Sequence, residues 1–249
     1  MIPFNNLAEA QTPDGSRMTL HEHDGDYFIK LNGRQLMSST STMSEIMLAD
    51  KACGPLQNKG TARVLIGGLG LGYSLKRVLE LVGKGAVVQV AELIPEVVTW
   101  NRELLAKVNG RLLADRRVEI IVDDVFAPIR KAGNTRYDAI LLDVDNGPTS
   151  FVQTKNRRLY DRRGLHAILR ALNPGGRVAF WSAAPEPHFR ESLKRAGFEA
   201  EEYPAKAHER AKRFEHMIYV GERLVHALPP AGAKAPPLPR PPDIPRSRR

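Results

Sequence analysis

Three acidic side chains follow apolar runs of the sequence and are candidates for chemistry. Glu92, Asp124 and Asp143 each stand at or near the end of a run that is typical of a buried strand. Because the carboxyl ends of strands in an open parallel sheet line a ligand crevice, we expect the three carboxylates to converge there. Together they can bind hydroxyl and amino groups and accept a proton. The three runs cover residues 86–91, 118–122 and 137–142.

A glycine-rich turn precedes the first of these acids. Gly68, Gly70 and Gly72 stand between a strand-like run and a helical pattern, and they allow positive φ and a close approach of the backbone to a ligand. Glu92 comes 24 residues after Gly68, which is the place of a carboxylate that accepts both hydroxyls of a ribose. A dinucleotide fingerprint needs a further glycine where this chain has Tyr73. The spacing therefore favours a sulfonium nucleoside, which has no pyrophosphate. The alternative interpretation of these glycines is a turn that binds no ligand.

Asp143 has the properties of a proton acceptor beside such a ligand. Displacement at a carbon bonded to a sulfonium needs an aligned nucleophile and no activation of the leaving group. An amine nucleophile, with an ammonium pKa near ~10.4, must first lose a proton, which Asp143 can accept directly or through water. The alternative role is a strand-end carboxylate that caps the following turn.

Seven strand-like runs alternate with helical patterns from residue 63 onward, which predicts one α/β domain with a Rossmann-like sheet. The last two runs, 198–200 and 216–220, are separated by a loop without an apolar helix face, so we expect the final pair to be antiparallel. Upstream, Asp24-Gly25 and Asn32-Gly33 separate short alternating runs. They predict a small β-hairpin unit ahead of the main sheet.

The chain divides into four expected segments. They are an N-terminal extension (1–15), the small β-unit with a helix (16–50), the Rossmann-like catalytic domain (51–228) and a disordered tail rich in proline and arginine (229–249). The tail holds eight prolines and few large apolar side chains, so it cannot bury enough surface to repay its ordering.

Composition excludes several classes of protein. The single cysteine, Cys53, rules out an internal disulfide, and we expect no metal site. No apolar run approaches a membrane span, and the first residues lack the pattern of a signal peptide, so we expect a cytoplasmic protein without a membrane partner. The net charge of +9 includes +4 from the tail. Because basic and aromatic residues do not interleave, we expect no nucleic-acid partner.

The order of these features resembles the class I S-adenosylmethionine-dependent transferases. Within them the chain looks most like the spermidine synthase family of polyamine aminopropyltransferases. The resemblance covers about residues 17–222 and includes the N-terminal β-unit with Gly33 and Gln35, the helix with Glu45, and the turn Gly70-Leu71-Gly72.

The resemblance implies a sheet of the methyltransferase type with its last strand antiparallel, a homodimer, and a role in polyamine biosynthesis. It implies S-adenosylmethionine or its decarboxylated form as cofactor, without a metal, and a small-molecule amine as substrate. Cofactor binding is expected at Gln35, Gly68, Gly70, Gly72, Glu92 and Asp124, with Asp123 as a rival for the adenine. Substrate binding is expected at Glu45, Asp145 and Asn146, with Asp143 as the catalytic residue.

One departure bears on the reaction. The family keeps an aspartate in the glycine turn, which pairs with the amine of decarboxylated S-adenosylmethionine, where this chain has Leu71. A leucine removes that preference for a bare amine. The hypotheses are therefore aminopropyl transfer to an amine, methyl transfer from intact S-adenosylmethionine to a small molecule, or a catalytically silent binding protein on this fold.

Overall fold

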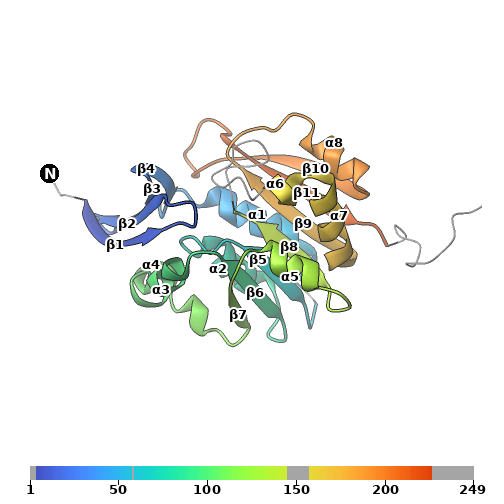
Figure 1. The fold of residues 1–249 in the computed structure, drawn as a ribbon, viewed down its shortest axis with the longest axis horizontal. Helices are drawn as coiled ribbons and strands as arrows, with labels where there is room; N and C mark the ends of the chain where they lie inside the picture. Colours follow the sequence, from blue (N-terminus) through green and yellow to red (C-terminus); the bar gives the residue numbers. More distant parts are fainter. Residues whose placement is uncertain (1–3, 58, 145–156, 226–249) are drawn as a thin grey trace, which may run out of the picture.

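The computed structural model describes residues 4–57, 59–144 and 157–225, and within them the fold is built on two sheets (Figure 1). The larger sheet has seven strands in the order β10-β11-β9-β8-β5-β6-β7. Neighbours from β7 to β9 are parallel, whereas β11 is antiparallel to both β9 and β10. This confirms the predicted seven-stranded sheet with its last strand antiparallel. The strands are β5 (Arg63–Gly67), β6 (Val87–Glu92), β7 (Val118–Val122), β8 (Tyr137–Leu142), β9 (Leu172–Ser182), β10 (Phe198–Ala205) and β11 (His216–Arg223).

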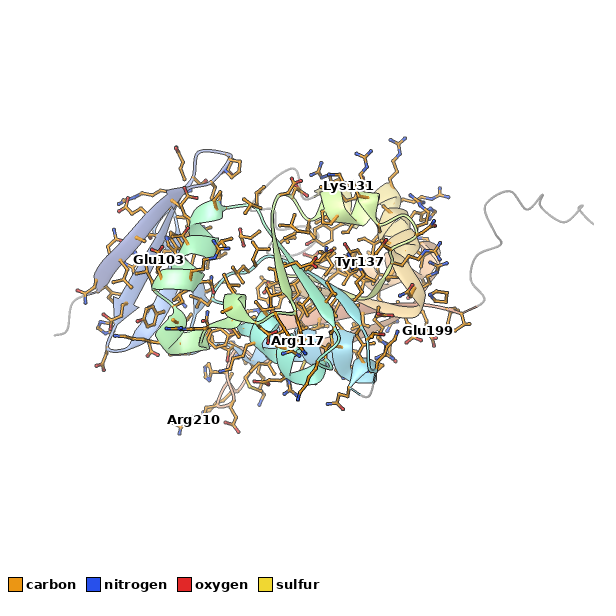
Figure 2. All side chains as sticks on the ribbon, turned by 90° about the horizontal axis from the view of Figure 1, so that it is seen from below. Glu103, Arg117, Lys131, Tyr137, Glu199 and Arg210 are labelled. Carbon is orange, nitrogen blue, oxygen red and sulfur yellow. The ribbon has the colours of Figure 1, made fainter. Side chains whose placement is uncertain are left out.

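Helices cover both faces of the large sheet, because its strands are apolar on both sides. In β5, Val64 and Ile66 belong to one core cluster and Leu65 belongs to the other. Figure 2 shows side chains filling the space between sheet and helices. The first cluster includes residues of α1 (Met43–Cys53), α2 (Tyr73–Leu81) and α3 (Pro95–Glu103), and the second includes residues of α5 (Phe126–Lys131), α7 (Arg162–Ala171) and α8 (Phe189–Arg195). Shorter helices are η1 (Gly54–Leu56), α4 (Ala106–Asn109), η2 (Leu112–Ala114) and α6 (Arg157–Tyr160).

The N-terminal unit is a four-stranded antiparallel sheet in the order β1-β2-β3-β4. Asp24-Gly25 and Asn32-Gly33 form two of its turns, with positive φ at all four residues, as expected of hairpins with these residue pairs. Its strands are β1 (Asn5–Gln11), β2 (Arg17–His23), β3 (Asp26–Leu31) and β4 (Arg34–Ser38).

Two expected segment boundaries were wrong. Residues 5–11 are not part of an extension, since they form β1 and pair with β2. The helix assigned to the small unit continues to Cys53 and packs against α2 and β9, so it belongs to the helix layer of the large sheet. Cys53 is buried. The expected tail at 229–249 lies outside the described residues.

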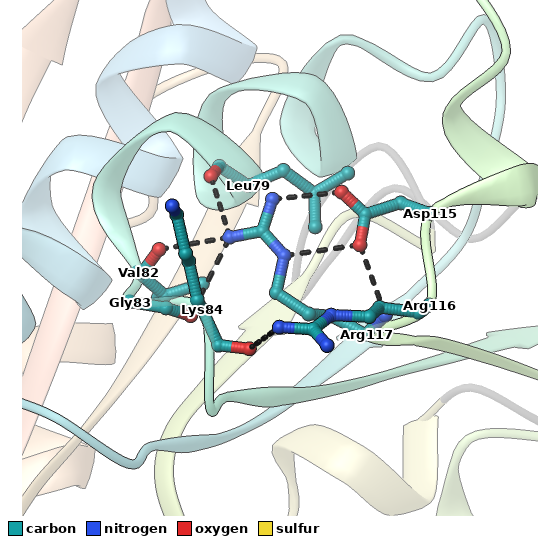
Figure 3. Close-up of polar contacts among 7 residues, drawn as sticks. All are labelled: Leu79, Val82, Gly83, Lys84, Asp115, Arg116 and Arg117. Atoms are coloured by element: carbon teal, nitrogen blue, oxygen red, sulfur yellow. Dashed lines mark hydrogen bonds and ion pairs between the residues drawn. The ribbon is translucent and has the colours of Figure 1, made fainter.

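Arg117 ties the end of α2 to the start of β7 (Figure 3). Its Nη1 donates to the carbonyl oxygens of Leu79 at 2.9 Å and Val82 at 2.8 Å. Its Nε and Nη2 donate to the carboxylate of Asp115 at 3.0 and 2.8 Å. The last carbonyls of a helix have no partner within the helix, so this guanidinium supplies donors that α2 itself lacks. The contact fixes the helix that begins at the glycine turn.

Arg117→Met should lower the free energy of unfolding by about 2–3 kcal/mol, because it leaves helix-end carbonyls and Asp115 without their charged donor. Urea denaturation measures this loss. Arg116→Met is the matched control, since the exposed Arg116 makes one long hydrogen bond of 3.4 Å to Lys84, and it should change stability by less than about 0.5 kcal/mol. Equal losses in the two variants would contradict this role for Arg117.

Candidate functional site

A cavity of about 410 Å³ lies where the strand ends of the large sheet meet the small sheet. That volume is in the range of small-molecule sites. One wall is formed by the glycine turn and the ends of β6, β7 and β8, and the other by β4, the start of α1, and residues 181, 207, 215 and 216. The cavity is lined by these predicted site residues: Gln35, Glu45, Gly68, Gly70, Glu92, Asp124 and Asp143.

Two of the three glycines face the cavity. A Cβ on Gly68 would lie 2.3 Å from the backbone oxygen of Asp143, and one on Gly70 would lie 2.5 Å from Sδ of Met37. Both glycines have positive φ. Gly72 also has positive φ, but it does not line the cavity, and a Cβ there would meet Asn109 at 2.8 Å. Gly68 and Gly70 therefore let β8 and β4 close around the site, whereas Gly72 serves packing behind the turn.

Glu92 holds the glycine turn with both of its carboxylate oxygens. Oε2 accepts a hydrogen bond from the backbone N–H of Leu69 at 2.8 Å, and Oε1 accepts one from Ile94 at 2.9 Å. The side chain is 7% exposed. Burial raises its pKa, and the backbone hydrogen bonds act in the opposite direction. A carboxylate has about four acceptor positions, so Glu92 keeps capacity for the hydroxyls of a ligand.

Asp123 and Asp124 both line the cavity, as the two candidates for the adenine. Asp124 is already engaged, because its Oδ1 accepts from the N–H of Phe126 at 2.8 Å and its Oδ2 pairs with Arg158 at 2.5 Å. The guanidinium of Arg158 also lies over the ring of Phe126, 5.0 Å from its centroid. Asp123 is exposed and accepts from the N–H of Asp124 at 2.7 Å. Either side chain can meet an adenine amino group, and their assignment stays a prediction.

Asp143 and Glu45 form a carboxyl pair in the same cavity. The backbone N–H of Asp143 donates to the oxygen of Gly67 at 3.0 Å, which places the side chain at the end of β8. Burial and the nearby Glu45 raise the pKa of Asp143 to about 8. Glu45 is 6% exposed and accepts a hydrogen bond from Oγ of Ser44 at 2.7 Å, and burial raises its pKa as well. Asp143 therefore retains its proton near neutral pH unless a cation enters.

Leu71 and Gln35 differ in their position relative to the cavity. Leu71 does not face the ligand site, because it is 1% exposed and packs in the core on the side of α1–α3. It therefore does not decide which form of the cofactor fits. Gln35 lines the cavity from β4 and is exposed. Asp145 and Asn146 lie outside the described residues.

The cavity also contains residues that sequence reasoning missed. Trp181 of β9 and His216 of β11 line it, with ring centroids 4.9 Å apart. Burial lowers the pKa of His216, so its imidazole is neutral at neutral pH. Trp181 stands near the end of a predicted strand, a signal that could have found it. His216 begins a strand and reaches the site only because β11 is antiparallel.

Two negative findings concern the described residues alone. Within 4–57, 59–144 and 157–225, no group of three or more His, Cys, Asp or Glu side chains is arranged to hold a metal ion. In the same ranges, no helix has the length and apolar character to cross a membrane.

Sequence comparisons connect the chain with transferases. A family described as S-adenosyl-L-methionine-dependent methyltransferase matches residues 95–213. A polyamine aminopropyltransferase of Corynebacterium efficiens is 30% identical over 178 residues, which are 70% of this chain and 32% of that protein. One from Prochlorococcus marinus is 24% identical over 194 residues, 66% of this chain and 65% of that protein. The matches thus span from about a third to just under two thirds of these relatives.

Solved structures show the same fold. Spermidine synthase from Thermotoga maritima superposes with a TM-score of 0.66 at 17% identity, covering 91% of this chain and 75% of that one. A probable spermidine synthase from Corynebacterium glutamicum gives 0.62 at 18% identity, covering 88% and 79%. The fold and the relatives define a protein of the S-adenosylmethionine-dependent methyltransferase-like superfamily. Within it, the chain is similar to spermidine synthases and polyamine aminopropyltransferases, as their distant homologue.

Gly68→Ala should destabilise the protein more than the strain of positive φ alone, because its Cβ would collide with the backbone at Asp143. Gly33→Ala is the control, since Gly33 has a similar φ of +80° against +87° but nothing within 4 Å of a Cβ. We expect Gly33→Ala to lower the free energy of unfolding by about 1 kcal/mol and Gly68→Ala by at least about 2 kcal/mol more. Chemical denaturation compares them, and similar losses would show that β8 does not approach the turn this closely.

The raised pKa of Asp143 predicts a pH dependence of stability. The folded protein holds a proton that the unfolded chain releases above its ordinary pKa of 3.8, so the free energy of unfolding should fall as pH rises from there toward about 8. Asp143→Asn should remove this part of the slope. Asp123→Asn, a change to an exposed carboxylate, should keep it. Thermal unfolding across pH 5 to 9 tests this, and an unchanged slope in Asp143→Asn would place the titration elsewhere.

Proposed function

We propose that this protein transfers an aminopropyl group from decarboxylated S-adenosylmethionine to a small-molecule amine. The observation that supports this most is the charge of the cavity. Six of its described lining residues are carboxylic acids, and none is lysine or arginine. A donor with a sulfonium and a bare amine, and an acceptor that arrives as an ammonium, are both cations and suit such a wall. The six acids are Glu45, Glu92, Asp123, Asp124, Asp143 and Glu215.

The residues present fit the nucleoside part of this ligand. Glu92 has spare acceptor capacity for the ribose hydroxyls, and Gly68 and Gly70 keep the turn free of side chains. Asp124 or Asp123 would bind the adenine amino group, and Gln35 would contact the ligand from β4. When bound, the ligand supplies an electrophilic carbon already activated by the positive sulfur.

The acceptor amine belongs, in this proposal, at the carboxyl pair. Asp143 and Glu45 bind its ammonium, and Asp143 receives one proton so that the nitrogen lone pair becomes available. The nitrogen then forms a bond to the propyl carbon while the carbon–sulfur bond breaks and the sulfur takes its electrons. Asp145 and Asn146 are proposed at this end from the family resemblance alone. A cytoplasmic homodimer acting in polyamine biosynthesis is part of the same proposal.

A second candidate is methyl transfer from intact S-adenosylmethionine, which the methyltransferase family match favours. Intact S-adenosylmethionine adds an α-carboxylate to the ligand. Because the described cavity wall offers no cationic side chain for it, the carboxylate would face like charges. A catalytically silent binding protein remains the third candidate, and it differs from both by the absence of turnover.

Calorimetry with decarboxylated and intact S-adenosylmethionine separates the two enzymes. We expect the decarboxylated ligand to bind more tightly by about 1–3 kcal/mol, or roughly one to two decades in Kd, since the two differ by one charge near buried carboxylates. Tighter binding of the intact ligand would instead support the methyltransferase.

Asp143→Asn extends the same test to the chemistry. It should abolish aminopropyl transfer while sparing the affinity for methylthioadenosine, because it removes the proton acceptor and keeps the shape. Full turnover in this variant would contradict the proposed role of Asp143.

A further inference from the structure

The two helix layers of the large sheet differ sharply in charge. Helices α5, α7 and α8 together carry eight lysines and arginines and one glutamate. Helices α1, α2 and α3 on the other face carry four lysines and arginines and five acids. Among these six helices, the positive charge is therefore concentrated on one side of the sheet.

Five of these side chains form what we call the basic face, because α5 packs against α7. All five are exposed, and among the described residues none of them forms an ion pair. Figure 2 shows Lys131 at the outer surface of the molecule. The basic face consists of Arg130 and Lys131 of α5 and Arg162, Arg163 and Arg170 of α7.

Nearby acids do not neutralise the basic face. The carboxylate of Asp161 accepts from the N–H of Gly164 at 2.7 Å as the N-cap of α7. Asp124 pairs with Arg158. In α8, by contrast, Glu191 lies within ion-pair distance of both Arg190 and Lys194, so the charge of that helix is partly neutralised.

The helix pattern holds the charges in place. Arg163, His166 and Arg170 follow one another at spacings of three and four, so they share a side of α7. The opposite side buries Leu165 and Ile168 in the core. The like charges are thus fixed on packed helices, where they repel one another unless an anion is present.

We propose that the basic face binds the phosphate backbone of nucleic acid. Four of the five side chains are arginines, whose planar guanidinium matches phosphate oxygens. None of the large exposed hydrophobic side chains of the described residues lies on α5 or α7, so the face lacks the apolar insertion that membrane-surface helices use. The sequence predicted no nucleic-acid partner because basic and aromatic residues do not interleave, but contact with phosphates requires no aromatic stacking. The basic face does not line the cavity, so this proposal is independent of the proposed function.

Fluorescence anisotropy of the full-length protein with a short mixed-sequence DNA duplex, across a series of salt concentrations, tests the proposal. The test variant is K131E/R163E/R170E. The control is K76E/R102E/K107E, which changes the net charge equally at exposed positions of α2, α3 and α4. We expect the test variant to lose affinity by about tenfold or more at low salt and its salt slope to shrink by about 3, while the control stays within about threefold of the wild type.

Equal losses in the two triple variants would overturn the proposal, since net charge rather than this face would then explain binding. So would a wild-type protein that does not bind the duplex, or one that binds anionic phospholipid vesicles but no DNA. Circular dichroism checks that the variants fold. If the triple variant does not fold, R163Q/R170Q against R102Q/K107Q provides the same comparison with milder changes.

Discussion

The hydrogen bonds from Leu69 and Ile94 to the Glu92 carboxylate are the contact on which the site depends. They join the glycine turn after β5 to the segment after β6, two strands that lie side by side. The turn has positive φ at Gly68, Gly70 and Gly72, a conformation that the rest of the chain must stabilise. The buried Glu92 carboxylate stabilises this conformation by accepting hydrogen bonds from the N–H groups of Leu69 and Ile94. The same carboxylate also lines the cavity. The same side chain therefore holds the turn and, in the proposed function, binds the ligand.

The second constraint is the surplus of negative charge in the cavity. Burial disfavours the charged form of Asp143, and the facing carboxyl of Glu45 adds to this effect, so that the pKa of Asp143 reaches about 8. A cation entering the cavity would reverse this preference and release protons. Protonation of the cavity would then depend on the charge of the ligand that binds. The small sheet helps to close the cavity, because it brings Met37 of β4 against the glycine turn.

Much of this arrangement could be predicted from sequence, because local patterns determine it. Two-residue alternation and the pairs Asp24-Gly25 and Asn32-Gly33 predicted the hairpins, and apolar runs ending in Glu92, Asp124 and Asp143 predicted acids at one edge of the sheet. The features of the site that could not be predicted from sequence depend on tertiary geometry. The direction of Leu71 follows from the path of a turn with several left-handed residues, and the pairing of Asp124 with Arg158 joins positions far apart in the chain. His216 reaches the cavity through an antiparallel strand, so its sequence neighbours gave no signal.

A crystal structure of the protein with methylthioadenosine tests the central claim most directly, namely that this cavity is a nucleoside site organised by Glu92. The account predicts both ribose hydroxyls within hydrogen-bond distance of the Glu92 carboxylate, with its bonds to Leu69 and Ile94 retained. It also predicts the adenine beside Asp123 or Asp124 and the sulfur on the side of Asp143. A nucleoside bound elsewhere, or one whose ribose makes no contact with Glu92, would contradict it.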